Sequence, residues 1–163
     1  MSHVYKIFRA PRHGWPMEEL FLAEAVTDLG LAGCAHARAG SKRQMLLVDR
    51  ETLDALELPP GIVRENVTTE GLNVNGLELG ETLRIGEALL EVTMVCTPCG
   101  LMEKIRSGLR REIRGRRGML CRVVRGGMIR PGDTIERIPA TLGVAIGDSA
   151  ESELDLRQRR ATA

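Results

Sequence analysis

Aromatic side chains, net charge and long apolar runs are all scarce in this chain of 163 residues. Phe, Trp and Tyr make up 2% of it, so recognition of single-stranded nucleic acid by base stacking is not expected. Lys and Arg total 23 against 22 Asp and Glu, and this balance removes bulk attraction to nucleic acid or to an anionic membrane. No apolar run is long enough for a transmembrane span or a secretory signal. We therefore expect a cytoplasmic protein that binds neither nucleic acid nor membrane.

Cysteine is sparse as well. The four are Cys34, Cys96, Cys99 and Cys121, and only Cys96 and Cys99 are close in sequence. In a reducing compartment such residues are more often buried, catalytic or metal-binding than joined in disulfides.

The apolar pattern predicts short strands separated by glycine-containing turns. Strands are expected over 4–9, 44–49, 82–85, 88–95, 119–124 and 134–138, and helices over 16–26, 51–58 and 96–109. Strands and helices do not alternate regularly, which argues against a doubly wound sheet. We predict a mainly β fold, a strand-rich β-barrel with a few short helices over residues 1–140, followed by a polar tail over 141–163.

The segment Cys96-Thr97-Pro98-Cys99 is the strongest chemical feature, because it links a predicted strand to a predicted helix. Thr97 suits the N-cap and Pro98 the first helical position, which would place Cys99 inside the first turn. Unpaired backbone N–H groups there favour a thiolate. We therefore predict Cys99 as the better nucleophile or metal ligand, with Cys96 as a second catalytic candidate.

Several interpretations of this segment remain open. Cys96 and Cys99 could exchange with a disulfide, or form half of a zinc site that Cys34 and Cys121 complete from a distance. Cys99 alone could bind a soft metal centre or carry sulfur. Both thiols could also be small apolar core residues.

Three further groups could bind a polar ligand. Arg64, Asn66 and Thr68 could line an anion pocket, although Asn and Thr side chains in a turn also bond their own backbone. Arg116 and Arg117 belong to an arginine-rich run that could hold a phosphate or simply form a solvated helix face. His36 could be a ligand or a base.

These features occur in a particular order along the chain, from about Val4 to Ile138. The pieces are Gly30-Leu31-Ala32-Gly33 with His36, Arg43-Gln44 through Asp49, Arg64-Glu65-Asn66 with Thr68 and Gly71-Leu72, Leu79-Gly80, Leu83-Arg84-Ile85-Gly86, Cys96 to Cys99, Gly115-Arg116-Arg117-Gly118, Arg122 to Val124, Gly126-Gly127 with Ile129, and Pro131-Gly132-Asp133. The series resembles the MOSC domain, named for the C-terminal domain of molybdenum cofactor sulfurase.

The resemblance implies a strand-rich barrel and a cysteine, Cys99 by motif position, that handles sulfur as a persulfide or coordinates the molybdenum of the pterin cofactor. It implies that Arg64, Asn66, Thr68, His36, Arg116 and Arg117 are the candidates for cofactor binding. Similar proteins include enzymes that reduce N-hydroxylated compounds, which implies a partner that supplies electrons or sulfur. A non-catalytic carrier of cofactor or sulfur is the alternative.

The chain also departs from that family. Where Gly-Asp-Arg-His is usual, it reads Gly33-Cys34-Ala35-His36. No pyridoxal-phosphate-binding desulfurase domain accompanies the resemblance, in contrast to the related sulfurases, so a sulfur donor would have to be a separate protein.

Overall fold

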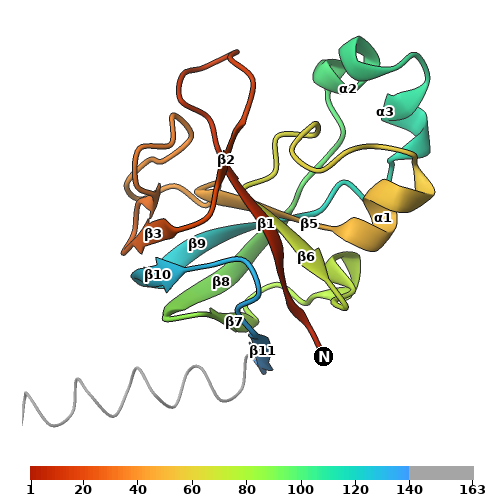
Figure 1. Cartoon of the computed structure of the whole chain (residues 1–163). Helices are drawn as coiled ribbons and strands as arrows, with labels where there is room; N and C mark the ends of the chain where they lie inside the picture. Colours follow the sequence, from red (N-terminus) through yellow and green to blue (C-terminus); the bar gives the residue numbers. More distant parts are fainter. Residues whose placement is uncertain (140–163) are drawn as a thin grey trace, which may run out of the picture.

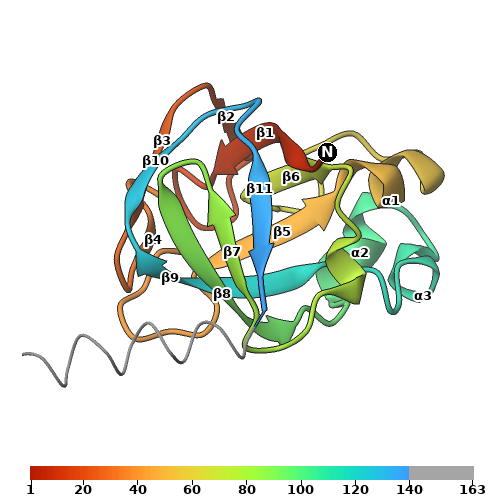
Figure 2. The same cartoon turned by 90° about the horizontal axis from the view of Figure 1, so that it is seen from below.

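A computed structural model describes residues 1–139, and the predicted tail over 141–163 lies outside the described residues. The larger of two sheets has eight strands in the order β11-β7-β8-β9-β5-β6-β1-β2, and the smaller has the order β10-β3-β4 (Figures 1 and 2). The strands of the larger sheet are β1 (His3–Arg9), β2 (Glu18–Leu20), β5 (Met45–Asp49), β6 (Val67–Glu70), β7 (Thr82–Ile85), β8 (Ala88–Val95), β9 (Met119–Arg125) and β11 (Ile135–Ile138). Those of the smaller sheet are β3 (Ala23–Val26), β4 (Gly30–Leu31) and β10 (Gly127–Ile129).

The mainly β prediction is confirmed, but the barrel is not. The two sheets are not closed on themselves, and a single bridge, between His3 and Thr134, joins the start of β1 to the segment before β11. All strand pairs are antiparallel except β5 and β6. That parallel pair requires a crossover, which α1 (Arg50–Ala55) and the following loop supply.

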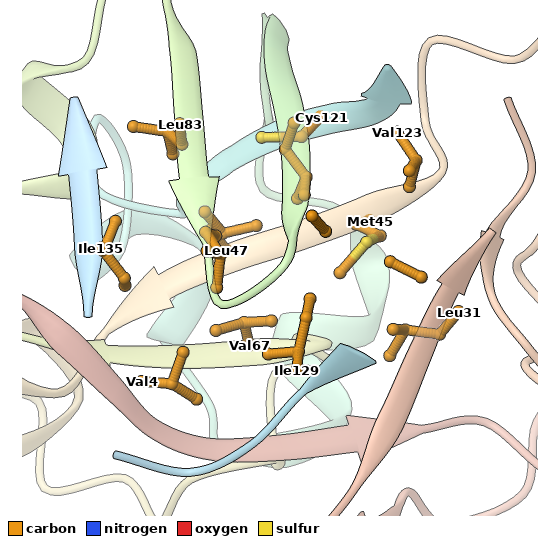
Figure 3. Packing of buried hydrophobic residues seen from close by; sticks show 14 of the residues in the cluster. Val4, Leu31, Met45, Leu47, Val67, Leu83, Cys121, Val123, Ile129 and Ile135 are labelled. Carbon is orange, nitrogen blue, oxygen red and sulfur yellow. The ribbon is translucent and has the colours of Figure 1, made fainter. Parts of the chain in front are cut away.

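The central strand β5 is buried on both faces, which divides the core in two. Met45 and Leu47 point into the larger cluster, together with Val67 and Cys121 (Figure 3). The alternate side chains of β5 join the smaller cluster beneath the helices. The members of the smaller cluster from β5, α1, α2, α3 and β9 are Leu46, Val48, Leu53, Met102, Leu109 and Leu120. In both views α1, α2 and α3 gather on one side of the molecule (Figures 1 and 2).

The predicted helix over 16–26 is wrong. β2 and β3 occupy this stretch, joined through the exposed Phe21 and Leu22. Its Glu, Leu and Ala residues favour a helix locally. However, Ala23 and Ala25 are buried in alternation and pair with β10, which lies about one hundred residues later. Tertiary pairing therefore overrides local propensity.

The predicted helix over 96–109 is also wrong in part. The segment from Cys96 to Cys99 is extended, and two short helices follow, α2 (Gly100–Ile105) and α3 (Leu109–Glu112). The break begins at Arg106, whose backbone is extended, and continues at Gly108, whose φ of 85° is the left-handed conformation that glycine tolerates. The Glu103 carboxylate accepts the N–H groups of Gly108 (3.0 Å) and Arg110 (3.0 Å), and so ties the end of α2 to the start of α3.

The remaining elements follow the predictions closely. Helix α1 spans Arg50–Ala55 with Asp49 at its N-cap position, and β7 and β8 have the predicted bounds. Strands β6 and β10 were not predicted, and neither was β4 within the glycine-containing loop. Within the described part of the chain, no helix has the length and apolar character needed to cross a membrane.

Candidate functional site

A cleft of about 690 Å³ lies where the loops after β1 and β4 meet the start of β6 and the segment leading into α2. It brings together His36, Arg64, Asn66, Cys96 and Arg117, five of the eight residues predicted for the site. The other three, Cys99, Thr68 and Arg116, are not among the described residues that line it.

The cleft is strongly cationic. Its lining includes Arg38, Arg43, Arg64 and Arg117, together with His13 and His36, and none of the described residues that line it is acidic. The rings of His13 and His36 lie 5.9 Å apart between centroids. Because the whole chain is nearly neutral, this local excess of positive charge gives the cleft an electrostatic character that suits an anionic ligand. The sequence motifs contained Arg43 but did not single it out, and neither Arg38 nor His13 was predicted as a site residue.

Arg117 is the most informative residue of the cleft. Its side chain is 5% exposed, and its Nη2 donates to the Val63 carbonyl at 2.7 Å. Its Nε and Nη1 are buried and have no acceptor among the described residues. Buried guanidinium donors are almost always paired, so two unpaired ones indicate a missing acceptor. An anionic group of a ligand satisfies that need, and it does so bidentately when it is a phosphate.

Glu65 does not neutralise Arg117 fully. Its carboxyl is completely buried, and burial raises its pKa, against hydrogen bonds from the Gly61 N–H and the Thr68 hydroxyl and against the charge of Arg117. Glu65 Oε2 is itself buried without a donor among the described residues, so Glu65 does not hydrogen-bond to Arg117. The Nε and Nη1 donors of Arg117 therefore have no acceptor from this neighbouring carboxyl.

Arg64 is held in position at the cleft wall. Its backbone has a φ of 67°, a left-handed conformation that costs a non-glycine residue about 1 kcal/mol. Its Nη1 donates to the Trp15 carbonyl at 2.8 Å, whereas its Nη2 is buried without an acceptor among the described residues. Strain of this kind is concentrated at binding sites.

Asn66 and Thr68 act within the fold. Asn66 is 2% exposed, accepts the Leu46 N–H at 3.0 Å, and donates to the Phe8 carbonyl (3.2 Å) and to Cys34 Sγ (3.5 Å). It thereby ties β5 and β6 to β1 at the base of the cleft. Thr68 is fully buried and donates to Glu65 at 2.9 Å. Side-chain bonding to the protein's own polar groups, the structural alternative raised from the sequence, describes both residues.

Cys96 and Cys99 lie in different surroundings, and one of the two predictions made for them is wrong. Cys99 is exposed and occupies the N-cap position of α2, so its predicted place inside the first helical turn is wrong. Thr97 is not the cap, because the Cys96 N–H donates to the Gly118 carbonyl at 3.0 Å and continues the β8–β9 pairing. Cys96 lines the cleft, where burial raises the pKa of its thiol, against the charges of Arg117 and Arg43. Sequence spacing could not show which thiol faces inward.

Cys121 and Arg116 are not among the described residues that line the cleft. Cys121 is fully buried among the strands, and burial raises its pKa to about 12. Among residues 1–139 no group of three or more His, Cys, Asp or Glu is placed to hold a metal ion, so the zinc alternative gains no support. Arg116 donates its Nε to the Glu112 carbonyl at 3.1 Å, and it lines a separate hollow beside α3.

Cys34 is a thiol that the sequence indicated only as a departure from the family pattern and as one of two that could complete a zinc site. Its Sγ lies at 3.4 Å from the Ala10 N–H and 3.5 Å from Asn66 Nδ2. Burial raises its pKa, but His36 and the backbone N–H groups of Ala10 and His36 outweigh burial and lower the pKa to about 7.

This lowered pKa makes stability depend on pH. A group whose pKa falls on folding stabilises the protein above its unfolded pKa, and that contribution is lost as pH falls through 7. The unfolding free energy of the wild type relative to Cys34→Ala should be about 2 kcal/mol larger at pH 9.5 than at pH 6. Urea denaturation at the two pH values measures it.

Cys121→Ala is the matched control, with the opposite sign. Because its pKa is raised on folding, the unfolded state ionises first. The stabilising contribution of Cys121 should decline by about 1 kcal/mol between the same pH values. Equal pH dependence in the wild type and Cys34→Ala would contradict a thiolate at Cys34.

The structure is a mainly β domain with a cationic cleft that Cys96 helps to line. The chain belongs to the MOSC domain family, whose model matches residues 35–136. MOSC domains are associated with molybdenum cofactor binding or with sulfur-related functions.

Solved structures share the fold at low sequence identity. YuaD from Bacillus subtilis has a TM-score of 0.74 and 22% identity over 84% of this chain and 96% of that protein. YiiM from Geobacillus stearothermophilus has a TM-score of 0.72 and 20% identity, covering 85% and 76%. YiiM from Escherichia coli has a TM-score of 0.60 and 24% identity, covering 85% and 68%. None of the curated proteins matches the chain.

Proposed function

We propose that the cleft binds the molybdenum cofactor, or a sulfur species destined for it, and that the domain reduces N-hydroxylated compounds with electrons from a separate protein. The observation that carries the proposal is Arg117, whose buried Nε and Nη1 need an anionic acceptor. A pterin cofactor bearing a phosphate has such a group.

The described residues fit this ligand in charge and in size. Arg117 would hold the anionic group, and Arg64, Arg43 and Arg38 add positive charge around it. The cleft volume of about 690 Å³ lies within the range of small-molecule and cofactor sites. His36 would donate a hydrogen bond from the loop after β4. When bound, the cofactor supplies the redox-active metal, whereas the protein supplies binding, orientation and a thiol.

The thiols have separate parts in the proposal. Cys99 does not line the cleft, so as the ligand or persulfide carrier implied by its motif position it would act from the exposed start of α2, where a partner protein can also reach it. Cys96 faces the cleft and contributes to its wall. The exposure of Cys99 also favours a second candidate function, a carrier that takes sulfur or cofactor from one protein and delivers it to another.

Two serine variants test the role of the thiols. Gently purified wild-type protein should contain molybdenum and sulfane sulfur, and Cys99→Ser should lose at least about 90% of both, because the thiolate is the donor that a soft metal prefers. Cys96→Ser should retain most of the sulfane sulfur. Elemental analysis and cyanolysis measure the two contents.

Cys121→Ala controls for loss of one thiol from the chain, since Cys121 is remote from solvent. Equal and negligible molybdenum and sulfane sulfur in the wild type and Cys99→Ser would reject the proposal. If the loaded protein, given reductant, does not turn over hydroxylamine-type substrates, the carrier function replaces the reductase. Equal damage from the two serine variants would instead favour exchange by a thiol pair.

A further inference from the structure

A second concavity of about 580 Å³ adjoins the cleft and has a different character. Its walls are mostly apolar, from the end of β1, the loop before β2, the loop after α1, and α2. The side chains that carry the argument are Phe8, Met17, Pro60, Ile62, Leu101 and Ile105. We call this concavity the apolar groove.

The apolar groove and the cleft are continuous in their linings. Arg64 and Leu101 belong to both. Arg64 therefore stands at the junction, with its Nη1 tied to Trp15 and its Nη2 buried without an acceptor among the described residues.

Charge limits what the apolar groove can accept. Its only charged lining residues among those described are Arg64 and Lys104, and both are cationic. Ile62 is 39% exposed, and Leu101 and Ile105 are half-buried, so apolar surface lies open to solvent here. An apolar concavity with a few convergent polar groups is the usual form of a small-molecule site.

From this continuity we infer that the apolar groove holds the apolar body of a small organic ligand whose anionic or oxygen-bearing end reaches Arg64. Cleft and groove then form one two-part site, with a cofactor-sized anion on Arg117 and the second ligand on Arg64. The binding of this ligand to the apolar groove does not depend on the proposed function, but its identification as the substrate does. If the proposed function holds, the substrates are N-hydroxylated compounds with an apolar ring or branched chain, rather than small polar ones.

A pair of fluorescent probes tests the inference on the full chain without cofactor. The first is 8-anilinonaphthalene-1-sulfonate, which has an apolar body and one anionic end, and the second is N-phenyl-1-naphthylamine, which lacks the sulfonate. The sulfonate probe should bind at a single saturable site. Ile62→Glu should weaken its binding by about tenfold or more, because the carboxylate removes apolar wall and repels the anion.

Matched variants separate the possible binding places. Leu79→Glu changes an equally apolar residue, 58% exposed, outside both linings, and it should alter affinity less than about twofold. Arg64→Gln should weaken the sulfonate probe by about tenfold while leaving the uncharged probe unchanged. Arg43→Gln changes the cleft alone and should leave probe binding intact.

Three outcomes would overturn the inference. Equal effects of Ile62→Glu and Leu79→Glu would mean that the probes bind exposed apolar residues in general. A loss with Arg43→Gln as large as that with Ile62→Glu would place the probe in the cleft. A wild-type dimer that Ile62→Glu converts to a monomer, seen by analytical ultracentrifugation, would make the groove an interface. Failure of the proposed function would appear separately, as missing molybdenum and sulfane sulfur with probe binding intact.

Discussion

Replacing Arg117 with methionine should abolish retention of the anionic ligand. Methionine preserves much of the apolar bulk but removes the two buried donors, Nε and Nη1, that lack an acceptor among the described residues. A hydrogen bond to a charged group contributes about 1.5–3 kcal/mol, so losing two should weaken binding by about 100-fold or more. The molybdenum and pterin contents of purified protein measure the effect.

The adjacent arginine provides the control. Arg116→Gln removes a charge one residue away, but Arg116 bonds the Glu112 carbonyl and does not line the cleft. It should therefore keep the ligand content within about twofold of the wild type. Arg117→Lys should recover part of the binding through its charge, without the planar geometry of a guanidinium. Equal ligand content in Arg117→Met and Arg116→Gln, with both proteins folded, would refute the role of Arg117.

Gly118→Ala should cause the largest loss of stability of any single methyl addition in this region. Gly118 has a φ of 105°, and a Cβ there would overlap the Leu47 carbonyl oxygen and lie 2.8 Å from Val48 Cγ2. Both neighbours belong to the central strand β5, which cannot move aside without disturbing the two halves of the core. Backbone strain and overlap together should lower the unfolding free energy by about 3–5 kcal/mol.

Gly115→Ala separates the two causes of that loss. Gly115 also has a positive φ, of 79°, but a Cβ there meets no atom within 4 Å. It should cost only about 1 kcal/mol, the strain of the left-handed backbone alone. Urea denaturation of both variants measures the difference. Similar losses in the two would show that β5 yields to the added methyl group.

Prediction from sequence succeeded where the secondary structure favoured by the local apolar pattern is also the one that strand pairing in the fold requires. The strands around Thr82–Ile85 and Ala88–Val95 have alternating or continuous apolar residues and a glycine turn between them, so their pairing partner is also their neighbour in sequence. The helix prediction over 16–26 failed because β3 pairs with β10 and β4, whereas a helix would form its hydrogen bonds within its own segment. A helical propensity of a few tenths of a kcal/mol per residue cannot compete with burial and ladder hydrogen bonds supplied from elsewhere.

The site residues also fall into those that the sequence could predict and those whose role depends on their neighbours in the fold. Arg64 and Arg117 could be named because their residue type alone suits an anion, and the structure brings both to one cleft. Asn66 and Thr68 carry side chains just as suitable for a ligand, yet the fold uses them to bond Leu46, Phe8 and Glu65. Polar side chains that can serve either purpose are assigned only once their neighbours are known.

By itself the sequence determined that the chain is mainly β, belongs with the MOSC domains and carries thiols and arginines suited to a soft, anionic ligand, because these follow from residue type and order. Only the tertiary structure decided that Cys96 faces the cleft while Cys99 faces solvent, and that Arg117 is buried with unpaired donors while Arg116 is not. The two cysteines have the same functional group and lie three positions apart, and the two arginines are adjacent in the sequence. What distinguishes them is the direction in which the backbone turns each side chain, and near the cleft that direction follows from the pairing of β8 with β9, which the bond from the Cys96 N–H to the Gly118 carbonyl extends.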